Sequence, residues 1–375
     1  MNLFIQSLKE YLKKTDWFLL IFSLVTSIYG LVLIYSATRS FNSDKYMYVQ
    51  IAALVMGIII FFVVGTFNFE QLSHFWIPIL FFNLLFLMSV LFFGEAGDSG
   101  NTSWIRFDAL GIGIQPGEIG KLLFIFTFSK HISLVGEKIN HPLSVLALLA
   151  HGGATVLAAY IFSKDLGMAI TYLLIMAIML IASGLSLKWI VPMGGLSLAS
   201  VPFIWKYVLK DYQRLRIEVV WNPEASEKYA YHAKQAKIAI GSGGLTGCGF
   251  LQGKQTQYAL LPAKHTDFIF AVCAEEFGLV GCAILMALLS AIILKIFYNA
   301  LKMNDTMSFC MCIGIGAMFL SQTLINIGMC AGVAPVIGLT LPFVSYGGSS
   351  LVTNFCAIGM LSSLLIHNRP RRVMW

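Results

Sequence analysis

Asp267 is the carboxylate of this chain that is best placed for acid–base chemistry. It stands directly before a long apolar run that begins at Phe268, and it closely follows Lys264 and His265. A carboxylate in that position can act as an N-cap, accepting hydrogen bonds from the first free amides of a helix. It can also act as a general base at the boundary between lipid and water, because burial raises the pKa of a carboxyl group toward neutral pH. Lys264 and the helix N-terminus would oppose that rise, so the sequence leaves both interpretations open.

Five further charged residues lie within or beside apolar runs. Glu275 and Glu276 fall inside the same long run, where carboxylates are costly and indicate a functional site unless a neighbouring helix satisfies them. Glu118 and Lys121 are three residues apart, a spacing that places them on one helix face as an ion pair. Asp165 stands at the edge of another apolar run. These residues predict either a charged cluster inside a helix bundle or solvated helix ends.

A glycine-rich stretch at 241–249 invites comparison with phosphate-binding loops. A nucleotide-binding loop needs Gly-x-x-x-x-Gly-Lys followed by Ser or Thr, whereas Gly253 and Lys254 are followed here by Gln255. We therefore exclude a nucleotide site. An outer loop whose amides and lysines contact a pyrophosphate stays open.

Polar residues also interrupt the apolar segments near the C-terminus. Gln322 and Asn326 lie one helical turn apart, and we expect them to hydrogen-bond between neighbouring helices. The stretch 342–350 carries Pro342 and a Gly-Gly pair, which predicts a broken or re-entrant entry into the last apolar segment. The seven cysteines show no metal-ligand spacing, so we predict neither a disulfide framework nor a metal cluster.

The composition places these residues in a membrane protein. Of the 375 residues, 58% are hydrophobic and 11% are charged, whereas about a quarter of the residues of a soluble domain are charged. The net charge of +7 comes from short basic clusters beside apolar runs, a pattern that sets membrane topology rather than nucleic-acid binding. We therefore predict an all-α polytopic membrane protein with no nucleic-acid partner.

The apolar segments predict ten transmembrane helices in a single domain, residues 1–375. A helix of about 20 residues crosses a bilayer with its backbone satisfied. The segments lie at 17–36, 47–65, 72–93, 119–136, 143–161, 166–183, 188–209, 268–298, 307–331 and 346–366. Residues 1–14 predict an interfacial helix, and the basic residues between spans favour a cytoplasmic location for both termini. Two outer loops follow, 94–118 and 210–267, the second a long folded connection between helices 7 and 8.

Several motifs together resemble the SEDS family, which comprises RodA, FtsW and SpoVE. The family's outer-loop motif is similar to residues 261–281, which contain Asp267, and its C-terminal signature is similar to residues 335–350. Residues 115–118 with Lys121, and residues 239–244, are also similar to family motifs. Within the family, residues 326–329 and 335–338 look most like RodA.

This resemblance implies a ten-helix glycosyltransferase that polymerises lipid II at the outer face of the bacterial cytoplasmic membrane, for cell elongation and shape or for division. It implies that Asp267 is the catalytic base, that undecaprenyl pyrophosphate leaves, and that a class B penicillin-binding protein is the partner that crosslinks the strands. Glu118, Asp165, Glu275 and Glu276 are expected as structural or functional polar positions. Substrate contacts are expected from Trp104, Arg106, Lys121, Lys264, His265, Arg214, Arg216, Ser345 and Ser349.

Two matters stay open at this point. A flippase that moves lipid II without chemistry is the main alternative, since intramembrane charges serve a translocation path equally well. The sequence indicates no certain cofactor, and a divalent cation, Mg²⁺ or Mn²⁺, is an open means of holding the departing pyrophosphate. The chain also departs from the family at three places, with Ser163-Lys164-Asp165 for the usual Gln-Pro-Asp, Ser103 for the usual Arg, and Gln235-Ala236 for the usual Gln-Ser.

Overall fold

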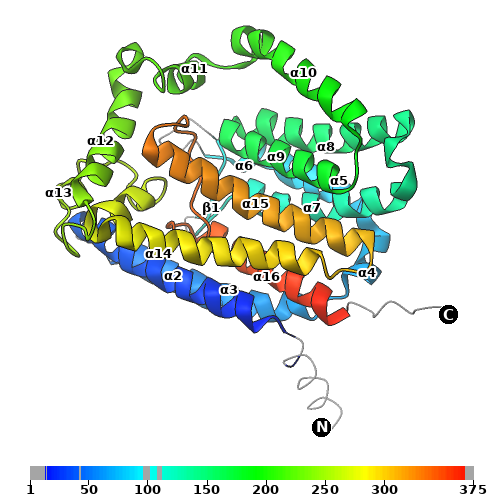
Figure 1. Ribbon diagram of the computed structural model, residues 1–375, viewed down its shortest axis with the longest axis horizontal. Coiled ribbons are helices and arrows are strands. Elements are labelled where there is room, and N and C mark those ends of the chain that lie inside the picture. Colours follow the sequence, from blue (N-terminus) through cyan, green and yellow to red (C-terminus); the bar gives the residue numbers. More distant parts are fainter. Residues whose placement is uncertain (1–12, 14, 42–43, 96–101, 108–111, 368–375) are drawn as a thin grey trace.

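The computed structural model describes residues 13, 15–41, 44–95, 102–107 and 112–367 (Figure 1). Its helices are α2 (Trp17–Thr38), α3 (Lys45–Gly65), α4 (Phe69–Leu72), α5 (Trp76–Met88), α6 (Val90–Phe93), α7 (Pro116–Val135), α8 (Pro142–Ser163), α9 (Leu166–Ala182), α10 (Leu187–Phe203), α11 (Asp211–Glu218), α12 (Glu227–Gly243), α13 (Lys254–Gln257), α14 (Ile269–Ala300), α15 (Thr306–Ala331) and α16 (Gly348–His367). Short 3₁₀ turns lie at Arg39–Phe41, Ser73–Phe75, Gly136–Asn140 and Pro223–Ala225, and a π turn at Ile204–Val208 extends α10. The strands β1 (Ile105–Phe107) and β2 (Ile112–Ile114) form one antiparallel hairpin.

Nine helical segments of the described residues are long and apolar enough to cross a membrane. They coincide with nine of the ten expected spans. The one expected span that does not reach this length, 166–183, is α9, an apolar helix of 17 residues. Seventeen residues rise about 26 Å, slightly less than the ~30 Å hydrocarbon core. The all-α polytopic membrane architecture is confirmed, and the count of ten crossings stays a prediction. The interfacial helix expected at 1–14 lies, except for Lys13, outside the described residues.

The long helices lie side by side along the long axis of the molecule, which is horizontal in Figure 1, and several of them pack on α15. α15 packs against α7, α9 and α14, while α16 packs along α3. Small residues on α15 allow this close packing: Gly314 faces Ile125 and Met179, and Gly316 faces Phe297. Without a hydrophobic driving force between helices in lipid, such close contacts are a main source of helix association.

The start of α2 and the end of α16 lie at the same end of the bundle. Asp16, just before α2, accepts a hydrogen bond of 2.7 Å from Asn299 near the end of α14, and Lys295 Nζ lies 3.7 Å from the same carboxylate oxygen. Ser363, near the end of α16, donates to the carbonyl of Phe67, just after α3. An even number of crossings brings two chain ends to one side in this way.

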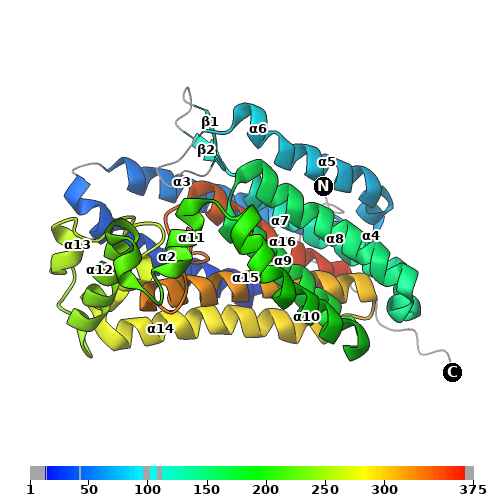
Figure 2. The ribbon, with the colours of Figure 1, turned by 90° about the horizontal axis from the view of Figure 1, so that it is seen from above.

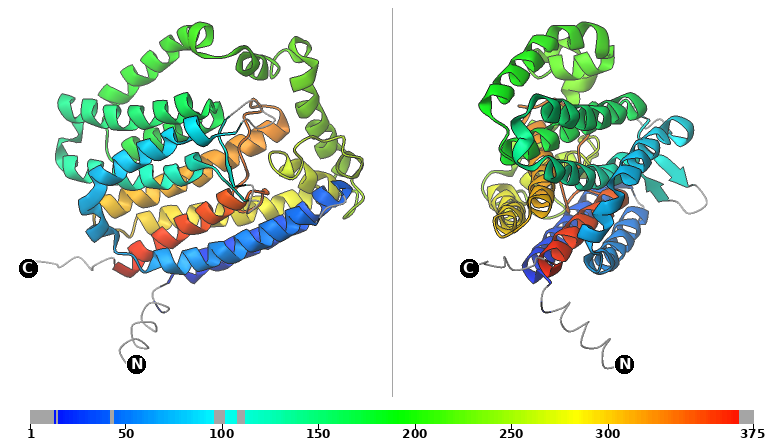
Figure 3. Two further views of the ribbon diagram at one scale, coloured as in Figure 1. Left: turned by 180° about the vertical axis from the view of Figure 1, so that it is seen from behind. Right: turned by 90° about the vertical axis from the view of Figure 1, so that its right-hand side faces the viewer.

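The connection between α10 and α14 is folded, as expected for residues 210–267. It forms α11, α12 and α13, and α12 packs along α14. α11 docks on the turn between α8 and α9, where Tyr212 Oη and Gln213 Nε2 donate to the Lys164 carbonyl at 3.3 and 3.4 Å. Thr102, which precedes the hairpin, donates its amide to the Ser163 carbonyl at the same turn. We call this side, opposite the end of α16, the loop end. The hairpin projects from the side of the bundle (Figure 3).

α10 diverges from the layer of long helices (Figures 1 and 3), and in the view from above it lies over α9 and α15 (Figure 2). Trp189 near its start donates a 3.1 Å hydrogen bond to the Asn140 carbonyl, but no residue of α10 is buried. Leu196 and Leu198 are 72% and 74% exposed. An apolar helix exposed on this scale contacts lipid in a membrane.

Two interruptions of helix lie near Asp267. α14 is broken at Gly278, whose φ of 64° is not helical. Residues 333–347 between α15 and α16 form no helix, yet Leu341, Phe343 and Val344 are at most 2% exposed. Irregular backbone at membrane depth is stable only when protein surrounds it. The broken entry predicted at 342–350 is therefore confirmed.

Candidate functional site

Asp267 lies in the turn that leads into α14, and the N-cap interpretation of this residue is wrong. The helix begins at Ile269, Phe268 occupies the N-cap position, and the amides of Ala271 and Val272 bond to the Phe268 carbonyl. No group among the residues that the structure describes donates a hydrogen bond to the Asp267 carboxylate. The Asp267 carboxylate therefore does not cap α14.

The turn 337–339 contacts this carboxylate. Gly338 has a φ of 74°, and a Cβ added to it would lie 3.6 Å from Asp267 Oδ2. On the other side of the turn, a Cβ added to Gly167 would lie 2.7 Å from the Ile337 carbonyl oxygen and 3.4 Å from Asp165 Oδ1. The close approach of these backbones brings Asp165 and Asp267, about 100 residues apart in sequence, to neighbouring positions at the loop end.

Arg216 of α11 is a cation whose charge acts on Asp267. Its guanidinium lies over the rings of Tyr212 and Tyr229, 5.6 and 5.3 Å from their centroids. Burial raises the pKa of Asp267 to about 6, the charge of Arg216 opposes that rise, and the charge of Asp165 adds to it. A carboxyl group with this pKa is deprotonated at neutral pH and still basic enough to accept a proton in a transition state.

Asp165 has a structural function of its own. It is the N-cap of α9, and its Oδ1 accepts a 3.0 Å hydrogen bond from the Met168 amide. The residue is buried, whereas the neighbouring Lys164 is exposed and adopts a left-handed backbone conformation. The structure thus places Asp165 beside the candidate base and fixes its carboxylate through α9.

Glu275 and Glu276 hold the connection between α10 and α14 onto α14. Glu275 accepts three hydrogen bonds from the start of α13: the Gln255 amide at 2.7 Å, the Thr256 amide at 3.0 Å and the Thr256 hydroxyl at 2.7 Å. Glu276 accepts from Ser36 Oγ at 2.5 Å and from Gln257 Nε2 at 3.0 Å. Glu275 is therefore satisfied, whereas Glu276 Oε2 has no hydrogen-bond partner among the described residues. The bonds that both carboxylates make to the loop favour a structural role for both residues.

The glycine-rich stretch also binds α14 rather than presenting free amides. The amides of Cys248 and Gly249 donate to the carbonyls of Glu275 and Glu276, at the break in α14, over 2.9 and 3.1 Å. Gly247 has a φ of 82°, and an added Cβ would lie 2.1 Å from the Glu276 carbonyl oxygen. These amides satisfy carbonyls that the interrupted helix leaves unpaired, so the amides of Cys248 and Gly249 are not available for the pyrophosphate contact that the sequence left open.

Lys264 and His265 point into the protein. Lys264 is 1% exposed, its Nζ donates to Ser40 Oγ at 2.6 Å and to the Thr256 carbonyl, and burial lowers its pKa to about 8. His265 is enclosed by the rings of Phe41, Tyr46 and Tyr346, and burial, aided by Lys264, lowers its pKa to about 4. Both residues brace the Asp267 turn rather than facing it as free cations.

The other expected substrate contacts are spread over the loop end. Ser345 Oγ donates to the Thr266 carbonyl at 2.6 Å, and Ser349 Oγ accepts from the Gln115 amide at 3.3 Å.

Trp104 packs against Gly113 of the hairpin. Arg106 Nε lies 3.6 Å from Glu95 Oε2, and Arg214 bonds to Asp211 and to the Lys206 carbonyl. Of the expected residues, Arg216 and Asp165 are the ones whose charges act on the Asp267 carboxyl group.

Glu118 and Lys121 form the expected ion pair on one face of α7. Lys121 Nζ lies 2.8 Å from Glu118 Oε1, and both side chains are almost fully buried. Tyr172 of α9 donates to the Gly117 carbonyl at 3.0 Å, and Gly117 packs on Met168 in the first turn of α9, three residues after the N-cap Asp165. The helical turn that carries the pair therefore packs on the start of α9, the helix that Asp165 caps.

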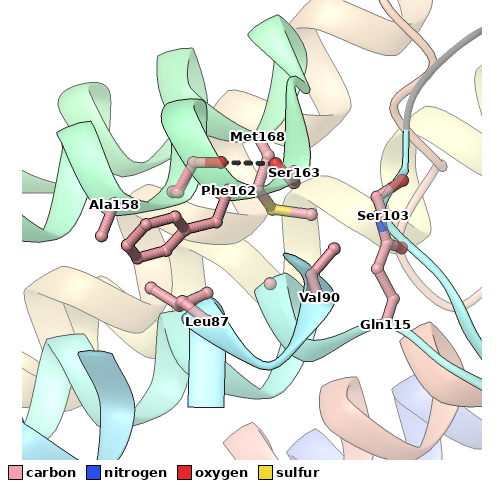
Figure 4. A pocket seen from close by; sticks show the side chains of 10 residues that line it. Leu87, Val90, Ser103, Gln115, Ala158, Phe162, Ser163 and Met168 are labelled. Carbon is pink, nitrogen blue, oxygen red and sulfur yellow. Dashed lines mark hydrogen bonds between the residues drawn. The ribbon is translucent and has the colours of Figure 1, made fainter. Parts of the chain in front are cut away.

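A small pocket lies between α5, α6, α8 and the first turns of α7 and α9, beside the residues that flank the hairpin (Figure 4). Ser103, Gln115, Phe162 and Met168 are among its lining residues, and its volume is about 10 Å³. This is room for about one water molecule. The pocket cannot admit a sugar and does not extend the site at Asp267.

Asn326 is a site residue that sequence reasoning assigned wrongly. It was expected to bond another helix, but its amide donates to two backbone carbonyls, those of Asp267 at 2.8 Å and Leu339 at 2.7 Å. Its partners belong to irregular segments, which no helical periodicity predicts. No sequence signal separates Asn326 from Gln322, which lies one turn earlier in the same helix.

Comparisons with known proteins identify the family. A family model described as cell cycle protein, which covers FtsW, RodA and SpoVE, matches residues 16–370. The peptidoglycan glycosyltransferase MrdB of Escherichia coli K12 is 34% identical over 366 residues, covering 95% of this chain and 97% of that protein. The probable peptidoglycan glycosyltransferase FtsW of Bacillus subtilis is 32% identical over 374 residues, covering 95% and 92%.

Solved structures share the fold. A chain from a study of how a peptidoglycan synthase complex coordinates polymerization and crosslinking superposes with a TM-score of 0.80 at 26% identity, over 94% of this chain and 97% of that one. The rod shape determining protein RodA of Thermus thermophilus superposes with a TM-score of 0.69 at 24% identity, over 95% and 98%, which supports the fold alone. With a family model that spans nearly the whole sequence, the chain is a member of the FtsW, RodA and SpoVE family.

Proposed function

We propose that this chain is a peptidoglycan glycosyltransferase that polymerises lipid II into glycan strands. The observation that carries the proposal is Asp267, a partly buried carboxylate at the loop end that no described group hydrogen-bonds and whose pKa burial raises to about 6. Relatives named peptidoglycan glycosyltransferase align along nearly all of the chain, which supports the same activity here. A RodA-like role in elongation and shape, or a role in division, follows from the same relatives.

In the proposed mechanism Asp267 takes the proton of the sugar 4-hydroxyl of one lipid II molecule. The freed oxygen attacks the anomeric carbon of a second molecule, the bond from that carbon to the pyrophosphate breaks, and undecaprenyl pyrophosphate leaves with inversion at the carbon. Such a reaction needs one base and stabilisation of the leaving group. We assign stabilisation of the leaving group to Arg216, because its positive charge acts near Asp267. Lys264 is not assigned this role, because its Nζ bonds to Ser40 Oγ.

The lipid tails of the substrates require a path beside the bundle. α10 has no buried residue, it packs on the bundle only through Trp189, Ile190 and Met193 among its hydrophobic side chains, and it leads into α11, which carries Arg216. We propose that polyprenyl tails lie against α10 while their pyrophosphates reach α11. Long apolar chains gain little by leaving lipid, so an exposed helix is a suitable boundary for them.

A divalent cation stays part of the proposal. Mg²⁺ is usually held by one or two carboxylates together with substrate phosphates. Asp267 and Asp165 are the carboxylates near the proposed pyrophosphate position, and a cation there would neutralise charge on the leaving group. The steps assigned to Asp267 and Arg216 stand without it.

The partner and the membrane are also proposed. We infer that a class B penicillin-binding protein crosslinks the strands, in agreement with a structural neighbour from a complex that couples polymerization and crosslinking. We place the chain in the bacterial inner membrane with both termini cytoplasmic. The α2 start and the α16 end lie at one side of the bundle, away from the loop end, which supports that orientation.

The rival function, flipping of lipid II, is separated from polymerisation by one reconstitution. Fluorescent lipid II is placed in one leaflet of proteoliposomes that contain the purified chain and its partner. We expect glycan oligomers to form and the rate of transfer between leaflets to equal that of protein-free vesicles. Protein-dependent transfer without oligomers would overturn the proposed function.

The rate of polymerisation should depend on pH through Asp267. A base acts when deprotonated, so a group with a pKa of about 6 gives a rate that falls as pH drops through about 6 and levels off above pH 7. In Arg216→Gln the falling limb should move to higher pH, because the cation lowers the pKa of Asp267. Initial rates measured from pH 5 to 8 check both expectations. A flat profile, or a limb that moves to lower pH in the variant, contradicts this assignment.

A further inference from the structure

Asn326 joins the two irregular segments that form the site. It lies on α15 and is fully buried, and its single Nδ2 donates to the carbonyls of Asp267 and Leu339 at 2.8 and 2.7 Å. Cys330, one turn later on the same face, donates its Sγ to the Asp267 carbonyl at 3.7 Å. One side of α15 thus holds the backbone of the residue proposed as the base.

The chemistry of these bonds requires an amide. The Asp267 carbonyl is outside the hydrogen-bond ladder of α14, because the first helical amides bond to Phe268. The Leu339 carbonyl belongs to a segment with no helix of its own. A short side chain with two N–H groups on one atom can satisfy both carbonyls at once, and the reversed amide would place its oxygen against two others. The orientation of the Asn326 amide is therefore fixed by its partners.

The same bonds fix the distance between the carboxylate and the turn that faces it. Leu339 directly follows Gly338, the residue whose added Cβ would lie 3.6 Å from Asp267 Oδ2. Asn326 therefore anchors both the residue that carries the carboxylate and the backbone wall beside it. Catalytic groups must be held within about 0.5 Å of productive geometry, and a displacement of 1 Å can cost about 100-fold in rate.

We propose that Asn326 is a positioning residue for the Asp267 carboxylate, acting through its two backbone hydrogen bonds. This inference rests on the proposed function of Asp267. Asn326 does not need to touch substrate. Its effect is on the turnover step, because it sets where the carboxylate stands relative to the sugar hydroxyl rather than how lipid II binds.

Gln322 is a matched control on the same helix face. It precedes Asn326 by four residues and is 1% exposed, and both polar atoms of its amide lack a hydrogen-bond partner among the described residues. Truncating Gln322 removes a buried amide of α15 without removing a bond to the site. A general effect of altering α15 should therefore appear equally in both variants.

The test compares Asn326→Ala, Asn326→Asp and Gln322→Ala with the wild-type chain in complex with its partner, using labelled lipid II. Asn326→Asp keeps the shape of the side chain and replaces the donor nitrogen by an oxygen, so it removes the two hydrogen bonds without opening a cavity. We expect both Asn326 variants to lower kcat about 10- to 100-fold, with KM near wild type. Their midpoints of thermal unfolding should fall, because two buried carbonyls lose a donor, and the rates are measured below those midpoints on folded protein. In Gln322→Ala, kcat should stay near wild type.

Three results would overturn the inference: kcat of both Asn326 variants near wild type, an equal loss in Gln322→Ala, or a change confined to KM. Asp267→Asn is assayed alongside to separate two kinds of failure. If it is inactive while the Asn326 variants are fully active, the positioning role alone is wrong. If Asp267→Asn retains wild-type activity, the proposed base is wrong and the positioning role falls with it.

Discussion

Asp267→Asn should abolish polymerisation while leaving the protein folded. The substitution keeps the shape of the side chain but removes the group that accepts the proton, and loss of a general base typically costs 10² to 10⁴ in rate, roughly. Folding should be preserved because no described residue hydrogen-bonds this carboxylate, and because burial disfavours its charged form, as the pKa of about 6 indicates. Replacing it by a neutral amide removes a charge that the fold itself does not need.

The measurement for Asp267→Asn pairs initial polymerisation rates with thermal unfolding and lipid II binding in the same detergent. Ser345→Ala is a useful comparison, since Ser345 bonds the adjacent Thr266 carbonyl and thus affects the same turn without removing a base. We expect the asparagine variant to unfold at the wild-type temperature and bind lipid II with no turnover. Turnover within a few-fold of wild type would remove Asp267 from the base role.

Lys121→Met should destabilise the bundle more than most single substitutions. It removes the cation 2.8 Å from Glu118 Oε1 and leaves a buried carboxylate whose Oε2 already lacks a partner among the described residues. Breaking a buried pair by removing one partner typically costs about 3–5 kcal/mol. Because the helical turn that carries the pair packs on the start of α9, the helix that Asp165 caps, activity should fall together with stability.

The double variant Glu118→Gln with Lys121→Met separates stability from function. It removes both charges, and buried pairs replaced by neutral side chains of similar volume are often neutral in stability. Thermal unfolding should therefore recover toward wild type relative to the single variant. A single variant that unfolds at the wild-type temperature, or a double variant less stable than the single one, contradicts a buried pair that stabilises the fold.

The membrane architecture could be predicted from the sequence because lipid leaves the backbone few choices. An apolar run of sufficient length can satisfy its amides and carbonyls only as a helix, so nine expected spans coincide with helices. α9 shows where this rule loses precision. This apolar helix has 17 residues, slightly fewer than the about 20 that cross a bilayer, so its length does not decide whether it is a span.

The candidate site was predictable only in part, because hydrogen bonds from side chains to distant backbone groups hold its segments together. Asp267 could be singled out by its place before an apolar run and by its motif. Glu275 and Asn326 could not be assigned, since their partners are backbone groups 20 and 59 residues away in sequence. The role of the glycine-rich stretch stayed open for the same reason, because the amides of Cys248 and Gly249 bond to backbone carbonyls at the break in α14.

The most direct test of the account is gel analysis of glycan products from labelled lipid II. The purified chain and its partner, with the partner's crosslinking site blocked by a β-lactam, are incubated with the substrate beside the Asp267→Asn variant. The account predicts a ladder of glycan strands from wild type and none from the variant. A ladder of equal strength from the variant, or none from wild type under conditions in which it binds lipid II and its partner, would contradict it.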